Sequence, residues 1–156
     1  MIEFRPIAES DIPQLQAWLE REHVLPWWRD EDAEDHLDPT EHFIIELDGE
    51  PVGMIQTYLV DDYPEWKAVV GTEPDLAGLD LLIGEEDAVG RGLGPRVISQ
   101  FAREVVFARP ETKAVVATVE EENRRSWRAF EKAGFRRVRD VEEEGRPHRL
   151  MRLDRS

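Results

Sequence analysis

Gly90-Arg91-Gly92-Leu93-Gly94-Pro95 is the stretch that decides the fold of this chain. It follows an apolar run, Leu79-Asp80-Leu81-Leu82-Ile83, which predicts a buried strand. Beyond Leu93, apolar residues recur at helical intervals, at Val97, Ile98, Phe101, Ala102, Val105 and Val106. Glycine allows a tight turn and has no Cβ to hold a ligand away, and proline suits a first helical turn. The pattern predicts a strand, a glycine loop and a helix start whose amides form a phosphate site.

Two familiar phosphate loops do not match this stretch. A P-loop has Lys-Ser or Lys-Thr after its last glycine, whereas Pro95-Arg96 follows here. A dinucleotide fingerprint needs a differently spaced third glycine and an acid about 20 residues later. A short glycine loop is by itself also typical of an ordinary turn, so a cofactor site requires a second motif.

A second motif lies downstream, after the β-branched run from Lys113 to Val119 that predicts a strand. It consists of Asn123-Arg-Arg-Ser-Trp-Arg-Ala-Phe-Glu-Lys-Ala-Gly134-Phe135. Asn123 is a good N-cap and Gly134 a good left-handed C-cap, so the segment predicts a helix with a strand beginning at Phe135. Alone, it would also fit any well-capped surface helix.

Together the two motifs resemble those of the GNAT acyltransferase superfamily. There, Arg/Gln-x-x-Gly-x-Gly/Ala wraps the diphosphate of acetyl-CoA, and a helix closes in Glu-Lys-x-Gly-Phe. In this chain the six loop positions are Val89-Gly90-Arg91-Gly92-Leu93-Gly94, so the leading Arg/Gln is absent. The resemblance implies central strands that splay apart and an acyl-CoA that enters the gap between them.

Length and composition limit the number of domains, the location and the kinds of site that the chain can have. A chain of 156 residues with 40% hydrophobic residues suits a single domain, spanning 1–156, with one core. No apolar run approaches the roughly 20 residues of a membrane span, and the first residues lack the apolar block of a signal peptide, so we expect a cytoplasmic protein. The absence of cysteine excludes disulfides and a thiolate nucleophile, and the four scattered histidines show no metal-ligand spacing.

The net charge of −15 disfavours nucleic acid and anionic membranes as partners, because both are bound through Lys and Arg. It favours a cationic small molecule. Solubility, or an acidic proteome such as that of a halophile, would explain the same charge, so the local placement of the acids matters more.

The remaining pattern predicts an α+β fold, or mixed α/β: a mostly antiparallel sheet of about seven strands with helices on both faces. Ser10 is expected to cap a first helix, and Asp48-Gly49 is a strong hairpin signal. Residues 61–75 look like an acidic loop. The predicted strands outside the two motifs are Ile2 to Ile7, His42 to Leu47, Pro51 to Val60, Leu76 to Gly84, Phe135 to Val141 and Arg146 to Leu153.

Two segments combine tryptophan with acids. Trp27 and Trp28 precede a run of acids at 30–34, and Trp66 lies among the acids of 61–75. In each case the tryptophan either fills the core beside solvated acids or forms a wall of a substrate pocket with an aromatic floor and an acidic rim. We expect one residue of the tryptophan pair in each role and favour a substrate wall for the second segment.

Asp80 interrupts an apolar window, where an ionised carboxylate is costly unless it is partnered. It lies either at a sheet edge or in a cleft. In a cleft it could orient an ammonium group and accept its proton, which would make the amine nucleophilic. We therefore predict that Asp80 is the catalytic base.

Within the superfamily, the chain resembles aminoglycoside 6'-N-acetyltransferases over nearly its whole length. The resemblance is carried by Trp18-Leu19 with His23-Val24 and Trp27-Trp28, Gly49–Gly53 with Gln56-Thr57-Tyr58, Gly78-Leu79-Asp80, Gly92-Leu93-Gly94 and Glu131–Phe135. It implies a substrate site that contains Trp27, Trp28, Tyr58, Glu65, Trp66, Glu73, Asp80 and Glu120. It implies an acetyl-CoA site that contains Leu82, Ile83, Gly90, Arg91, Gly92, Leu93, Gly94, Arg96, Asn123 and Phe130.

One departure bears on the mechanism. Many members carry a tyrosine just before Glu-Lys-x-Gly-Phe that can protonate the leaving thiolate, and this chain has Phe130. Water or Ser126 would supply the proton, or the thiolate leaves unprotonated, since a thiol pKa is near 8.5. The substrate acid near Glu120 is also in uncertain register, because Glu121 and Glu122 are alternatives.

Two other functions remain open at this point. Siderophore-pathway lysine acyltransferases share the paired tryptophans and the His-Val pattern, although acidic segments favour a multiply cationic acceptor. A non-catalytic domain that senses CoA or a cation would explain the missing tyrosine and loop Arg/Gln. The assembly is expected to be a monomer or a homodimer.

Overall fold

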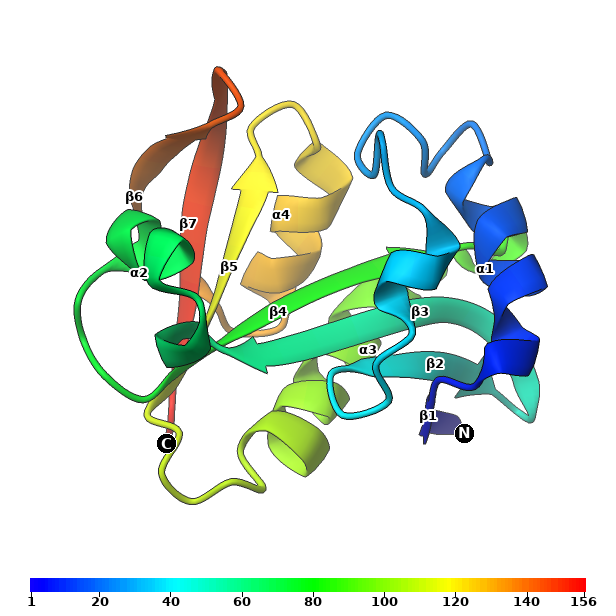
Figure 1. The fold of residues 1–156 in the computed structure, drawn as a ribbon, viewed down its shortest axis with the longest axis horizontal. Coiled ribbons are helices and arrows are strands. Elements are labelled where there is room, and N and C mark those ends of the chain that lie inside the picture. Colours follow the sequence, from blue (N-terminus) through cyan, green and yellow to red (C-terminus); the bar gives the residue numbers. More distant parts are fainter. The chain divides into compact units, whose positions relative to one another are not determined.

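The computed structural model describes residues 1–156 and contains a seven-stranded sheet of order β1-β2-β3-β4-β5-β7-β6 (Figure 1). β4 and β5 are parallel, whereas β1–β2, β2–β3, β5–β7 and β6–β7 are antiparallel. The strands are β1 Ile2–Pro6, β2 His42–Leu47, β3 Glu50–Leu59, β4 Leu76–Ile83, β5 Ala114–Glu120, β6 Arg136–Glu143 and β7 Arg146–Asp154. The helices are α1 Ile12–Leu19, α2 Pro64–Val70, α3 Leu93–Phe101 and α4 Arg124–Lys132. This confirms the predicted mixed, mostly antiparallel fold.

The chain contacts define two compact units, each made of two stretches of sequence. The first comprises 1–56 and 80–93, and the second comprises 57–79 and 94–156. A single domain over 1–156 therefore stays a prediction. None of the helices is long and apolar enough to cross a membrane.

The first unit is built around the indole of Trp18, whose side chain is fully buried. Its Nε1 donates a hydrogen bond to Glu85 Oε2 at 2.6 Å. Gly84 faces this ring, since a Cβ there would lie 2.0 Å from the indole. The same core contains Ile7, Leu15, Leu19, Val24, Ala33, Ile44, Met54 and Leu82.

The β2–β3 hairpin of this unit has the predicted turn. Asp48 has φ of 51° and Gly49 has φ of 86°, and two consecutive left-handed residues are what a type I′ turn requires. Asp48 also pairs with the N-terminal amino group of Met1. The sequence signal Asp-Gly is therefore confirmed.

In the second unit, helices cover both faces of the strands. Ala114 and Val116 of β5 pack in one cluster with Trp66 and Val70 of α2. The alternate residues of β5 are also buried, and α4 contacts β5, β6 and β7. Both faces of β5 are thus protected, which explains its nearly continuous apolar sequence.

Two sequence predictions need correction. Ser10 does not cap α1: a 3-10 turn at Glu9–Asp11 precedes the helix, and Asp11 occupies the N-cap. The Asp11 carboxylate instead accepts the Ala8 amide and two bonds from Arg5 at 2.8 and 2.9 Å. Residues 61–75 are not all loop, because Pro64–Val70 form α2. The spacing of Trp66 and Val70 lets this short helix bury one face.

Candidate functional site

The glycine loop has the backbone that its composition predicts. Gly90 and Gly92 have φ of 89° and 73°, in the left-handed region that side chains disfavour. No atom would lie within 4 Å of a Cβ added to either, so conformation rather than crowding requires glycine. Gly90, Arg91 and Gly92 are exposed, whereas Leu93 is buried and begins α3. The loop thus presents exposed backbone just before a helix N-terminus.

Asp80 lies on an inner strand and is exposed, although Leu79 and Leu82 on either side of it are buried. The strand order places β4 between β3 and β5, so Asp80 is not on an outermost strand of the sheet. The parallel pairing of β4 with β5 covers Leu76 to Gly78 and does not include Asp80, while β4 itself continues to Ile83. A solvent-accessible carboxylate on an interior strand is suited to contact a ligand; its role as base stays a prediction.

Two predicted cofactor residues contribute side chains to the core. Leu82 is 4% exposed, and Phe130 is 1% exposed and packs edge-on against Phe135 at 5.0 Å between ring centroids. Only the backbone of Leu82 is therefore suited to meet a ligand. The carbonyl oxygen of Ile83 lies 2.9 Å from His23 Nε2 and is already hydrogen-bonded.

The remaining predicted cofactor residues lie around α3 and α4. Arg91 and Arg96 are exposed, and Gly94 is close to α4, because a Cβ there would lie 3.4 Å from Ala129 Cβ. Asn123 occupies the predicted N-cap of α4, but its side chain makes no capping hydrogen bond. Its carbonyl instead accepts the amides of Ser126 and Trp127.

The first tryptophan segment contributes mainly to packing. Trp28 packs against the core of the first unit, and its ring lies 5.8 Å from that of His36, edge to face. The His36 ring lies 5.1 Å from His42, and burial lowers the pKa of both histidines below the usual range. Trp27 is half-buried, and the acids at 30, 31, 32 and 34 are exposed. Trp28 thus has the core role expected for one of the pair.

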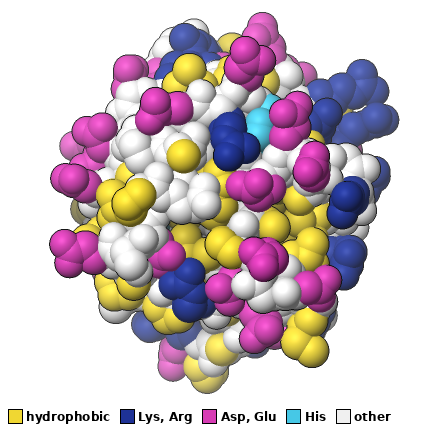
Figure 2. Space-filling view, turned by 90° about the vertical axis from the view of Figure 1, so that its right-hand side faces the viewer, with side chains coloured by type: hydrophobic (Ala, Val, Ile, Leu, Met, Phe, Trp, Pro, Cys, Tyr) yellow, Lys and Arg dark blue, Asp and Glu magenta, His cyan; other side chains and the backbone are white.

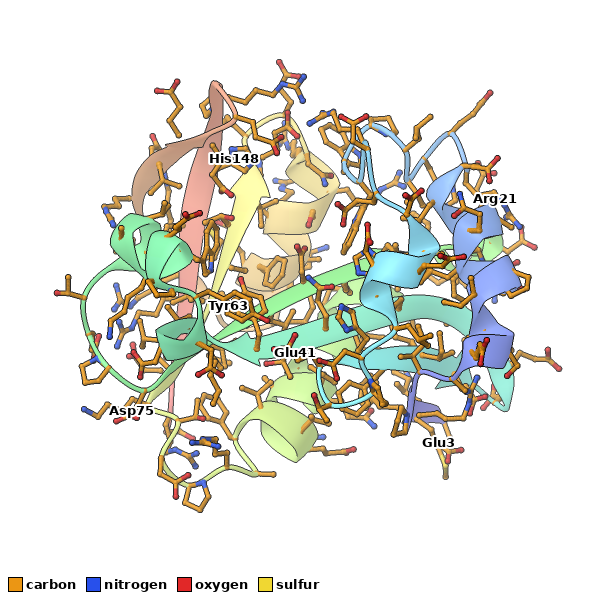
Figure 3. The ribbon with its side chains drawn as sticks, in the orientation of Figure 1. Glu3, Arg21, Glu41, Tyr63, Asp75 and His148 are labelled. Atoms are coloured by element: carbon orange, nitrogen blue, oxygen red, sulfur yellow. The ribbon has the colours of Figure 1, made fainter.

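The second tryptophan segment forms a pocket of about 670 Å³ with the β6–β7 turn. Its lining combines two aromatic rings with five carboxylates: Asp62, Tyr63, Pro64, Glu65, Trp66, Val69, Glu142, Glu143 and Glu144. Tyr58 adjoins the pocket through Tyr63, since the two rings contact each other edge to face with centroids 5.3 Å apart. Figure 3 shows Tyr63 just before α2. The structure thus brings together three predicted substrate residues, Tyr58, Glu65 and Trp66.

Two buried polar atoms of this pocket have no hydrogen-bond partner within the protein, Nε1 of Trp66 and Oε2 of Glu143. Buried polar groups are normally satisfied, so both are candidates to bind a polar ligand or water. Glu142 and Glu143, which end β6, and Glu144 of the following turn were missed as site residues. Their uninterrupted charge was the available signal.

The other two predicted substrate acids already have partners. Glu73 accepts hydrogen bonds from Arg152 at 2.7 and 3.3 Å, and this guanidinium lowers the pKa of the Glu73 carboxyl. Glu120 lies 3.7 Å from Arg146, and its side chain is 10% exposed. Across the molecular face in Figure 2, acidic side chains are widely spread among apolar ones.

Comparison with known proteins assigns the family. A family model described as an acetyltransferase (GNAT) domain matches residues 8–143. Aminoglycoside N(6')-acetyltransferase type 1 from Klebsiella pneumoniae is 29% identical over 150 residues, which cover 87% of this chain and 74% of that protein. The enzyme of the same name from Serratia marcescens gives the same values.

Solved structures agree with this family. The crystal structure of aminoglycoside acetyltransferase AAC(6')-Ib in complex with coenzyme A has a TM-score of 0.88 at 28% identity, covering 99% of this chain and 95% of that chain. The complex of AAC(6')-Ib with coenzyme A and kanamycin has a TM-score of 0.87 at the same identity and coverage. The glycine loop, the helix α4 with the left-handed Gly134 after its C-terminus, and these matches lead to one conclusion: this chain belongs to the GNAT acetyltransferase family.

Proposed function

We propose that this chain transfers the acetyl group of acetyl-CoA to the 6'-amine of an aminoglycoside. The observation that carries the proposal is the pocket of the second unit, where five carboxylates surround Tyr63 and Trp66. Such a lining suits a ligand with several ammonium groups and apolar sugar faces, because carboxylates attract the charges and rings stack on them. Relatives at 29% identity are aminoglycoside N(6')-acetyltransferases, and AAC(6')-Ib is solved with kanamycin.

The residues present fit a diphosphate-bearing acyl donor. The exposed, left-handed Gly90 and Gly92 allow close approach to the backbone, and the dipole of α3 favours an anion beside them. Arg91 and Arg96 are exposed cations of the same segment. When bound, acetyl-CoA supplies the thioester carbonyl that the amine attacks.

We assign the removal of the amine proton to Asp80. An exposed carboxylate on an inner strand attracts the ammonium group and accepts one proton, directly or through a water molecule. The neutral amine then forms the new C–N bond as the C–S bond breaks. Direct attack is assigned because the chain has no cysteine that could form a covalent intermediate.

The proton of the leaving thiol has no tyrosine donor in this scheme. The residue before Glu131 is Phe130, which is buried in the core. A thiolate is a tolerable leaving group because a thiol pKa is near 8.5, so we propose that it leaves unprotonated or is protonated by water. Backbone amides near Leu82 are proposed to stabilise the tetrahedral oxyanion.

A thiol-release assay tests the function. The purified chain, acetyl-CoA and kanamycin should release free thiol, and product analysis should place one acetyl group on the 6'-nitrogen. An aminoglycoside with a hydroxyl at the 6' position serves as the matched control and should release none. Binding of acetyl-CoA without thiol release for any amine would instead identify a sensor, and release with lysine-like amines alone would favour a siderophore-type acyltransferase.

A further inference from the structure

The three successive glutamates at the end of β5 differ in what surrounds them. Glu121 accepts two hydrogen bonds from Arg149, at 2.5 and 3.0 Å. The same guanidinium stacks on the Trp127 ring at 3.7 Å, and Trp127 Nε1 donates to the Glu121 carbonyl. Glu121 is therefore held in a structural ion pair. Glu122 is exposed.

Glu120 lies on the face of the sheet that carries the pocket. It pairs with His148 of β7, which is labelled in Figure 3, and His148 in turn pairs with Val141 of β6. Paired residues of neighbouring strands project to the same face. Val141 packs with the cluster that includes Trp66, so Glu120 and His148 project toward α2 as well. The strand register thus places Glu120 on the same face of the sheet as Trp66.

Arg146 lies on the same face and connects Glu120 to the pocket rim. It pairs with Glu143, which lines the pocket, and its Nη1 lies 3.7 Å from Glu120 Oε1. His148 adds a second basic group, with Nε2 3.9 Å from Glu143 Oε2. The hairpin therefore places its own cation among acids that would otherwise face the ligand.

The ion pair between Arg146 and Glu120 is suited to be broken, so that another cation can take the place of Arg146. The Arg146 side chain is 45% exposed, and 3.7 Å exceeds a close charge-assisted hydrogen bond. The Glu120 side chain is only 10% exposed, so Arg146 is the partner that contacts water and can move away. Holding its long side chain in place costs entropy, which is regained when it is released. By contrast, Arg149 is held by two hydrogen bonds and a ring, and is not suited to leave.

We propose that Arg146 is a specificity-determining residue: it binds Glu120 in the free enzyme and must be displaced by an ammonium group of the acceptor. This inference rests on the proposed function of the pocket. Arg146 then acts as an internal competitor that disfavours acceptors with few positive charges. An acceptor with several ammonium groups displaces it more readily, because the pocket acids hold the rest of the ligand.

The test compares steady-state kinetics of variants with kanamycin. Arg146→Gln should lower the KM for kanamycin about 3-fold to 5-fold and leave kcat unchanged, since one weak pair is removed. Arg146→Lys, which keeps the charge, should resemble the wild type. Arg103 lies in the π-helical segment Ala102–Val106 and has an exposed side chain, so Arg103→Gln removes the same charge elsewhere and should change the KM little.

A double-mutant cycle decides whether Glu120 is the partner. In a Glu120→Gln background the KM is expected to be higher, and Arg146→Gln should no longer lower it. An unchanged or higher KM for Arg146→Gln, or an effect that persists without Glu120, would overturn the inference while leaving the function intact. If the wild type acetylates no aminoglycoside, the proposed function fails first, and the inference fails with it.

Discussion

The two tryptophan segments have similar compositions and different structures. In the first, Trp28 packs on a hydrophobic core beside His36, and the neighbouring acids are exposed. In the second, Trp66 and Tyr63 line a pocket together with acids from a turn far along the chain. The local sequences of the two segments both combine tryptophan with acids and do not distinguish them. In the second segment, the carboxylates of Glu142, Glu143 and Glu144 join from another part of the chain.

This comparison shows that an acidic, aromatic stretch forms a pocket when a second segment converges on it. Glu142, Glu143 and Glu144 complete the pocket through the β6–β7 register, in which Glu143 pairs with Arg146. At the first segment, Glu31 lies 3.1 Å from His36 Nε2 and contributes to internal structure. Four measurements test this difference between the two segments.

The largest effect is expected from Asp80→Asn, which separates chemistry from acceptor binding. Turnover should fall about 10²-fold to 10⁴-fold, the usual contribution of a general base. Affinity for kanamycin and acetyl-CoA, measured by calorimetry, should change much less if the second segment supplies most acceptor binding. Full activity of the variant would refute the assignment of the base.

Neutralising the acids of the two segments tests the contrast directly. Replacing Glu142, Glu143 and Glu144 by glutamine should raise the KM for kanamycin about 10-fold and weaken its dependence on salt, because screened attraction is lost. The matched variant replaces Asp30, Glu31 and Asp32 by their amides and should leave the KM nearly unchanged. Equal effects of the two triple variants would mean that both segments bind the acceptor.

Single tryptophan substitutions should separate an effect on acceptor binding from an effect on the stability of the fold. Trp66→Ala is expected to raise the acceptor KM about 10-fold, since a ring that contacts the ligand is lost. Trp28→Ala should lower the free energy of unfolding by about 2 kcal/mol, as expected for a partly buried ring, with little change in KM. Urea unfolding and steady-state kinetics measure the two quantities. A KM effect confined to Trp28→Ala would reverse the comparison.

The smallest effect is a pH dependence of stability that belongs to the first segment. Burial lowers the pKa of His36 and His42, so below the ordinary value of 6.5 the unfolded chain binds more protons than the folded one. Stability should therefore be fully present above pH 6.5 and decrease as the pH falls below it. His36→Gln should flatten the change in urea midpoint between pH 7.5 and 5.5. An unchanged slope would show that His36 does not contribute.

Much of the fold was predictable because short-range chemistry specifies it. Asp48-Gly49 forms a left-handed turn because Asp and Gly both tolerate positive φ, and Gly134, with φ of 100°, follows the end of α4 for the same reason. The predictions failed where contacts between residues distant in sequence determine the local structure. Ser10 was expected to cap α1, but Asp11 occupies the N-cap and is held there by Arg5. Helix α2 forms where a loop was expected, because Trp66 and Val70 pack in a hydrophobic cluster.

For the site, the sequence by itself determined the residue types and the family: a glycine loop, a helix followed by Gly134 and an acid within an apolar strand. These depend on backbone propensities and periodicity, which act over a few residues. Only the tertiary structure decided that Glu121 is held by Arg149, that Glu120 faces the side of Trp66, and that the β6–β7 turn completes the pocket. Strand pairing joins residues distant in sequence, and a shift of one residue would turn each side chain to the other face.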